Sequence, residues 1–216
     1  MMMYSFRLAF YLFVAALFSS CASSSHGDLG KAFFSAVKTD NASLVNEALG
    51  RGFDPNTADE QGQVGLFLAM REGSAKVAAV LLAHPATRLD ATNTTDETPL
   101  MMAALRGRPD WVQRLLDRGA QVNRPGWTPL HYAATGPEPK CVAHLLDRGA
   151  AIDAPSPNRS TPLMMAARYG SDEAADLLLR RGASPKLRND RGMNASDFAK
   201  SAGRDALAAR LEAAAR

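Results

Sequence analysis

Apolar side chains recur at helical spacing from about residue 28 to the C-terminus, in short segments separated by polar turns. Within alternate segments the apolar residues stand three or four positions apart, which gives a helix one buried face. These positions are Val77, Leu81 and Leu82; Trp111, Val112, Leu115 and Leu116; Cys141, Val142, Leu145 and Leu146; and Ala174, Leu178 and Leu179. The pattern predicts a series of short amphipathic helices, each of which must pack against a neighbour.

A seven-residue segment stands before three of these amphipathic segments. It reads TPLMMAA at residues 98–104, and near copies follow at 128–134 and 161–167. Threonine suits the position before a helix, because its hydroxyl accepts a hydrogen bond from an unpaired backbone N–H. The proline after it lacks an N–H that would have no partner there. We therefore expect a helix to begin at each threonine and to approach its neighbours closely through the small alanines.

Two details of the helix ends follow from the same comparison of segments. Gly73, Gly107 and Gly170 are expected to end the helices that begin at the threonine position, in the left-handed conformation that glycine adopts readily. The inserted residues 83–86 are expected to lengthen the second helix of their pair.

The unit recurs along most of the chain. Equivalent positions fall at residues 31, 64, 98, 128, 161 and 194, in steps of 33, 34, 30, 33 and 33 residues. This period and the Thr-Pro-Leu-His-x-Ala pattern resemble the ankyrin repeat. The resemblance implies an all-α solenoid over residues 28–216, built of about six helix-turn-helix pairs joined by β-hairpin-like turns, with the outer two repeats acting as caps. The short step of 30 residues predicts a truncated turn at 121–127.

Residues 1–20 have the pattern of an export signal peptide. Arg7 is followed by an apolar run from Leu8 to Phe18 and then by small residues. This run is too short for a membrane-spanning helix, which needs about 20 residues. Cleavage of the segment is therefore expected.

The sequence LFSSC at residues 17–21 resembles the bacterial lipobox, although Phe18 stands where that motif prefers an aliphatic residue. The resemblance implies that Cys21 carries lipid, that residues 21–27 form the lipidation site and a short tether, and that the protein is a periplasmic lipoprotein held at the outer membrane. The alternative is ordinary cleavage after Ala22.

Composition and motifs argue against several classes of function. The formal net charge of +3 is too small to indicate nucleic-acid binding, and the chain has no dense run of Lys or Arg. It lacks the sequence patterns of metal, phosphate-loop and hydrolase sites, so no enzyme activity, metal or cofactor is expected. His131 occupies the histidine position of the repeat, where the resemblance implies a hydrogen bond between repeats. Cys141 aligns with apolar residues and is expected to be a buried, inert thiol.

Ankyrin repeat proteins generally bind other proteins through a concave face, and the resemblance implies the same here. Aligned with that face are Arg71, Leu105, Arg106, Arg124, Trp127, Arg168 and Tyr169. Three of these, Arg71, Arg106 and Arg168, would form a positive strip beside the two aromatic residues, and arginine with aromatic residues is typical of binding hot spots. Each arginine could equally be an ordinary solvated charge at a helix end.

Four methionines, Met101, Met102, Met164 and Met165, are expected to pack in the interior. The sequence thus predicts a monomeric, noncatalytic scaffold for a protein partner whose identity the chain does not reveal. The alternative function is a stabilising or chaperone-like factor for one envelope enzyme.

Overall fold

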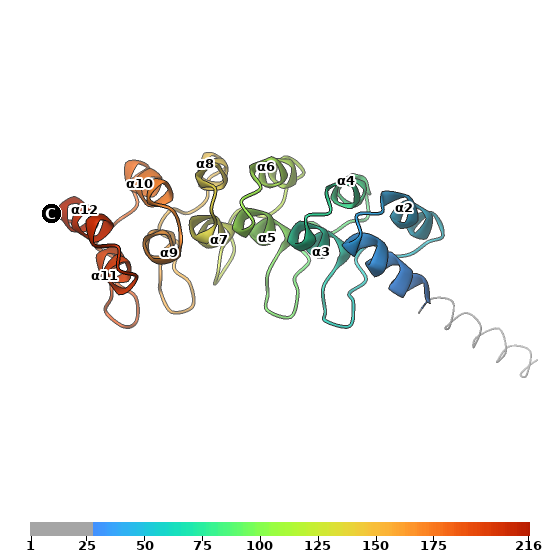
Figure 1. Ribbon diagram of the computed structural model, residues 1–216, viewed down its shortest axis with the longest axis horizontal. Helices are drawn as coiled ribbons and strands as arrows, with labels where there is room; N and C mark the ends of the chain where they lie inside the picture. Colours follow the sequence, from blue (N-terminus) through green and yellow to red (C-terminus); the bar gives the residue numbers. More distant parts are fainter. Residues whose placement is uncertain (1–27) are drawn as a thin grey trace, which may run out of the picture.

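The computed structural model describes residues 28–216, and over this range the chain forms pairs of helices stacked into a curved array (Figure 1). The first helix is described from residue 28 to residue 38, and it pairs with α2 (Ala42–Gly50). The pairs that follow are α3 (Gly65–Glu72) with α4 (Ala75–Ala83), α5 (Pro99–Leu105) with α6 (Pro109–Asp117), α7 (Pro129–Thr135) with α8 (Pro139–Asp147), α9 (Pro162–Tyr169) with α10 (Asp172–Arg180), and α11 (Ala195–Ser201) with α12 (Asp205–Ala214). The predicted all-α repeat solenoid is confirmed.

The predicted signal peptide, Cys21 and the segment 21–27 lie outside the described residues. Within the described range, no helix is both long enough and apolar enough to cross a membrane.

The helices form two layers. Helices α4, α6, α8, α10 and α12 lie along the outer, convex side of the arc, while the loops before α3, α5, α7, α9 and α11 project as fingers on the other side (Figure 1). The concave face is therefore made by the first helices of the pairs and by these fingers.

The predicted N-caps at Thr98 and Thr161 are confirmed, since each threonine hydroxyl accepts a hydrogen bond from the backbone N–H three residues on, at 3.2 and 3.4 Å. A second bond runs in the opposite direction. The sulfur of Met101 accepts from the N–H of Thr98 at 3.4 Å, and the Nδ1 of His131 accepts from the N–H of Thr128 at 3.2 Å. Methionine and histidine thus fill the same capping position in different repeats.

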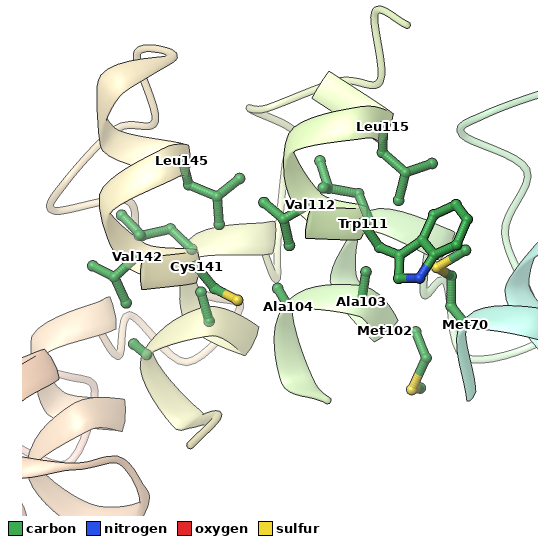
Figure 2. Close-up of a cluster of buried hydrophobic side chains, with 14 of the residues drawn as sticks. Met70, Met102, Ala103, Ala104, Trp111, Val112, Leu115, Cys141, Val142 and Leu145 are labelled. Carbon is green, nitrogen blue, oxygen red and sulfur yellow. The ribbon is translucent and has the colours of Figure 1, made fainter. Parts of the chain in front are cut away.

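The core lies between the two layers. Alanine pairs such as Ala103 and Ala104 are fully buried, which lets neighbouring first helices approach closely. Figure 2 shows side chains of α6 and α8, among them Val112, Cys141 and Leu145, pointing down toward these alanines. Stacking of one repeat on the next therefore buries a continuous core, as a solenoid requires.

Four of the fingers are closed by a backbone hydrogen bond across their base. The pairs are Asp59 to Gln63, Asn93 to Glu97, Ser156 to Ser160 and Asn189 to Met193, with N···O distances of 2.9, 3.1, 2.9 and 3.0 Å. The finger at residues 121–127 has no such bond in the described chain, and it is visibly shorter in Figure 1. The truncated turn expected from the 30-residue step is confirmed.

Two expectations about the helix ends are wrong. Gly73 and Gly107 have positive φ as predicted, but Gly170 has φ −87° and is therefore not left-handed. Glycine is needed there for another reason: a Cβ would overlap the carbonyl oxygen of Ala134 in the preceding repeat. The residues 83–86 also do not lengthen their helix, because α4 has nine residues like α6 and α8. Ala83 is the last residue of α4, and residues 84–86 lie in the turn that follows.

Arginine side chains join successive repeats on the outer side. Arg148 pairs with Asp117, and Arg181 pairs with Asp147 at 2.8 Å. At the C-terminal end, Nη1 of Arg204 donates to the carbonyl oxygens of Ala166, Ala167 and Gly170 at 2.9, 3.0 and 2.9 Å. This contact gives a donor to carbonyls at the end of α9, of which Ala166 also accepts from the N–H of Gly170, and it anchors the terminal repeat to that helix.

Candidate functional site

A small pocket opens beside the short finger. Its volume is about 210 Å³, and it is lined by Leu105 from the end of α5, Trp127 from the finger, His131, Tyr132 and Thr135 from α7, and Met165 from α9. Three successive first helices therefore contribute to one apolar depression. We call these six residues the Trp127 pocket.

Trp127 is the most unusual residue of this pocket. Its side chain is 36% exposed although it is large and apolar. Its ring stands edge to face against the imidazole of His131, with the ring centroids 5.2 Å apart. Leu105 and Trp127, both predicted from the sequence for the concave face, line this same pocket.

His131 is held between two repeats. Its Nδ1 lies 2.8 Å from the hydroxyl of Thr128, and its Nε2 lies 3.0 Å from the carbonyl oxygen of Ser160. The predicted hydrogen bond between repeats is confirmed. Burial lowers the pKa of His131 below its usual value, because the charged imidazolium would lose its hydration. The neutral ring therefore donates from Nε2 and accepts at Nδ1.

The other polar groups of the Trp127 pocket are also already bonded. The hydroxyl of Thr135 donates to the carbonyl oxygen of His131 at 2.9 Å. The hydroxyl of Tyr132 donates to a carboxylate oxygen of Glu97 in the preceding finger at 3.0 Å. Burial and this carboxylate both raise the pKa of Tyr132, so the phenol stays protonated. Tyr132, Thr135 and Met165 were missed from the sequence as site residues.

The arginines of the predicted strip differ in their surroundings. Arg71 pairs with Glu72 at 2.7 Å and also bonds to Gln63, so its charge is compensated. Arg106 is exposed at the end of α5, and within the described chain it forms no ion pair or side-chain hydrogen bond. Arg168 lies 5.2 Å above the ring of Tyr169 and bonds only to the hydroxyl of Ser201, at 3.3 Å. The uncompensated charge is therefore at Arg106 and Arg168.

Arg124 has a structural role in the short finger. It pairs with a carboxylate oxygen of Asp96 at 2.7 Å and also donates to the Asp96 backbone carbonyl at 2.7 Å. The short finger is thus tied to the finger before it. Tyr169, by contrast, is 56% exposed and contributes an open aromatic surface beside Arg168.

The interior carries no obvious chemistry. Cys141 is fully buried, and burial raises the pKa of its thiol to about 12, so it is a poor nucleophile. Among residues 28–216, no group of three or more His, Cys, Asp or Glu side chains is placed to hold a metal ion. Met101, Met102 and Met164 are buried as expected, but Met165 is only half-buried and faces the Trp127 pocket.

A larger open groove of about 940 Å³ lies between the first helix and the first finger. Its lining includes Lys31 and Lys38 together with Asp59 and Glu60, so both signs of charge meet there. Asp59 already accepts backbone hydrogen bonds from Gln61 and Gln63 at 3.0 and 2.8 Å, which shape the finger. The groove therefore defines no single kind of ligand.

The comparisons with known proteins agree with this architecture. A family model described as ankyrin repeats (3 copies) matches residues 33–125 and 121–189. The chain belongs to the ankyrin repeat family.

Curated relatives share the repeats over part of their length. The putative palmitoyltransferase ZDHHC13 of Danio rerio is 30% identical over 165 residues, which is 76% of this chain and 21% of that protein. A putative ankyrin repeat-containing protein of Treponema pallidum (strain Nichols) is 27% identical over 168 residues, 78% of this chain and 46% of that protein. The chain thus spans less than half of the length of these relatives.

Among solved structures, this chain is similar to a chain in the complex of the predatory endopeptidase Bd0816 from Bdellovibrio bacteriovorus with immunity protein Bd3460. The TM-score is 0.73 at 27% sequence identity, and the match covers 85% of this chain and 97% of that one. The matching chain is the immunity protein.

Proposed function

We propose that this chain is an exported ankyrin repeat protein that binds a partner protein through its concave face and catalyses no reaction. The observation that carries the proposal is the Trp127 pocket, where the short finger leaves a large aromatic side chain 36% exposed beside an apolar depression. Exposed tryptophan and arginine side chains at a concave surface are typical of binding hot spots. The binding residues are Leu105, Arg106, Trp127, Arg168 and Tyr169, with Arg71 and Arg124 at the edges.

The mechanism is noncovalent. Five of the six pocket residues lie on short helices whose inner faces are buried, and Trp127 packs against His131 on one of them, so little conformational freedom is lost when a partner binds. His131 and Tyr132 are held by the hydrogen bonds that they donate to Ser160 and Glu97 of the neighbouring repeats. A protein interface commonly buries about 1,600 Å² in total, so a partner would cover several repeats around this pocket.

The class of partner is suggested by the similar immunity protein, which was solved in complex with an endopeptidase. We extend this to propose a peptidase of the cell envelope as the partner, whose activity this chain restrains. The pattern of residues 1–20 and the lipobox-like sequence at Cys21 support a periplasmic location with a lipid anchor in the outer membrane. A stabilising factor for an envelope enzyme would use the same surface but would raise the activity of its partner.

Affinity capture tests the binding proposal. The tagged chain and a variant with Trp127→Ala, Arg106→Glu and Arg168→Glu are exposed to envelope extract, and captured proteins are identified. Arg180 on the outer helix α10 is exposed, so Arg180→Glu is a matched control for charge reversal. A defined protein captured by the parent and the control but lost with the triple variant supports the proposal, and equal capture by all three removes it.

Two further measurements test the effect on the partner enzyme and the lipid anchor. Activity of the captured enzyme, assayed with and without the chain, falls if the chain restrains it and rises if the chain stabilises it. The mass of the mature N-terminus, measured on protein from the membrane fraction, shows lipid on Cys21 if the anchor is present. A plain N-terminus after Ala22 would contradict the lipoprotein proposal.

A further inference from the structure

The Trp127 pocket has the size of one side chain. Its volume of about 210 Å³ is below the roughly 300–1,000 Å³ of sites that enclose small-molecule ligands or cofactors. A single leucine, methionine or phenylalanine side chain is a better match to this space. The pocket is therefore suited to an anchor residue on the surface of a larger partner.

The chemistry of the lining selects an apolar anchor. The hydroxyls of Tyr132 and Thr135 and both ring nitrogens of His131 already have hydrogen-bond partners within the protein. The other lining groups belong to Leu105, Trp127 and Met165, whose surface is apolar apart from the indole N–H of Trp127. A polar group placed in the pocket would lose its bonds to water and could regain at most the one from the indole N–H of Trp127, and each bond not regained costs about 1–3 kcal/mol. An apolar group incurs no such loss.

The arginines at the helix ends favour a particular charge in the partner residues around that anchor. Arg106 directly follows Leu105, and Arg168 lies one helical turn after Met165, so each stands next to a pocket residue along the chain or on the same helix face. Neither has an acidic partner among the described residues. On α7, between them, the equivalent positions are Thr135 and Gly136, which are uncharged.

On the finger side the electrostatics are different. Glu97 accepts hydrogen bonds from Tyr132, Asn93 and Thr95, and Asp96 is paired with Arg124. The positive potential is therefore confined to the helix-end edge of the pocket. Acidic residues of a partner are favoured at that edge, and basic residues there would be repelled.

We infer that the Trp127 pocket receives one large apolar side chain from an acidic segment of the partner, with carboxylates beside it paired to Arg106 and Arg168. The inference rests on the proposed function, since it names the chemistry of the partner at that surface. In a second copy of the chain, exposed Leu187 is flanked by Lys186 and Arg188, which would meet Arg106 and Arg168 with like charge. Exposed Leu44 has Glu47 three positions on, so self-association is kept as an outcome of the test.

Selection from a library of displayed random 12-residue peptides tests the inference. The full chain with Cys21→Ser is immobilised after export. Peptides that also bind the Thr135→Phe variant are discarded, because the larger side chain of that variant fills the pocket. Circular dichroism and thermal unfolding are used to check that this variant is folded. The expected peptides carry leucine, methionine or phenylalanine with Asp or Glu within three positions.

The NMR signals of the two tryptophan indole N–H groups show where a selected peptide binds. The chain has two tryptophans, and Trp111 is buried between the layers while Trp127 lines the pocket. Titration of a selected peptide is expected to shift the indole N–H resonance of Trp127 and to leave that of Trp111 in place. The dissociation constant should rise about tenfold with Arg106→Glu and stay unchanged with Arg180→Glu.

The inference would be overturned if the selected peptides are basic or lack an apolar anchor, or if they bind without moving the Trp127 resonance. It would also be overturned if every peptide that binds the chain binds the Thr135→Phe variant as well. Self-association of the chain that Trp127→Ala abolishes would identify a second copy as the occupant and would also overturn it. These outcomes differ from failure of the proposed function, which shows as capture from envelope extract that is unaffected by the triple variant.

Discussion

The indole of Trp127 meets the imidazole of His131 edge to face, with ring centroids 5.2 Å apart and ring planes at 80°. This is a favourable geometry for aromatic pairs. His131 is itself fixed by the hydroxyl of Thr128 in its own repeat and by the carbonyl of Ser160 in the next. The exposed tryptophan is therefore supported by a bond between repeats, and the wall of the pocket is in place before any partner arrives.

Stability should depend on pH through His131. Burial lowers the pKa of His131 in the folded state. As the pH falls below about 6.5, His131 is therefore protonated in the unfolded chain before it is protonated in the folded one. The contribution of His131 to the free energy of unfolding is thus present above pH 6.5 and is lost below it. His131→Met places at this position the residue found at Met101 and Met164, so capping can persist while the titration is removed.

Urea unfolding at pH 7.5 and pH 5.0 measures this effect. At pH 7.5 the wild type is expected to be about 1 kcal/mol more stable than His131→Met, because the variant loses the bond to Ser160. The difference should shrink or reverse at pH 5.0. A difference that is constant across this range would show that His131 does not titrate differently on unfolding.

Replacement by asparagine should destabilise the protein more at Gly170 than at Gly182. Gly182 has φ +95° and no atom near the position of a Cβ, and asparagine tolerates the left-handed conformation. Gly182→Asn is expected to cost less than about 1 kcal/mol. Gly170→Asn should cost about 3 kcal/mol, because its Cβ overlaps the carbonyl oxygen of Ala134. Equal midpoints in urea for the two variants would contradict the close-approach explanation.

Arg204 should matter more than its neighbour Arg210. Loss of Arg204 leaves the carbonyls of Ala166, Ala167 and Gly170 without this donor, so Arg204→Met is expected to cost about 2 kcal/mol. Arg210 is exposed and contacts only carboxylates of α10, so Arg210→Met should cost less than about 1 kcal/mol.

Hydrogen exchange of the amides in α11 and α12 is the measurement for this pair of variants. The Arg204 variant should lose protection in these two helices while α5 and α6 keep theirs, since each repeat contacts mainly its neighbours. Similar protection in both variants would show that the arginine contact does not anchor the terminal repeat.

Much of the fold could be predicted because its determinants are local. Threonine followed by proline sets where α5, α7 and α9 begin, whatever lies around them. Gly170 could not be interpreted from its own neighbours, because the atom that excludes a side chain belongs to Ala134, 36 residues earlier in the chain. The same limit applies to α4, where the inserted residues leave the helix unchanged and enlarge the turn.

Part of the candidate site could be predicted from the sequence. Leu105 and Trp127 stand at positions that differ between repeats, which singles them out in an alignment of the copies. Tyr132 and Met165 occupy the variable position after the histidine of the motif, but only the three-dimensional structure places them beside Trp127 in one pocket. The bonds that fix Arg71 to Glu72 and Arg124 to Asp96 follow from three-dimensional contacts, and they reduce the predicted positive strip to Arg106 and Arg168.

Site-specific photocrosslinking in the native cell tests the central claim most directly. A photoreactive amino acid replaces Trp127 in one variant and Gln113, on the outer helix α6, in a matched control. The account predicts one defined crosslinked protein from position 127 and none from position 113. Crosslinks to the same protein from position 113 but not from position 127 would contradict binding through the concave face.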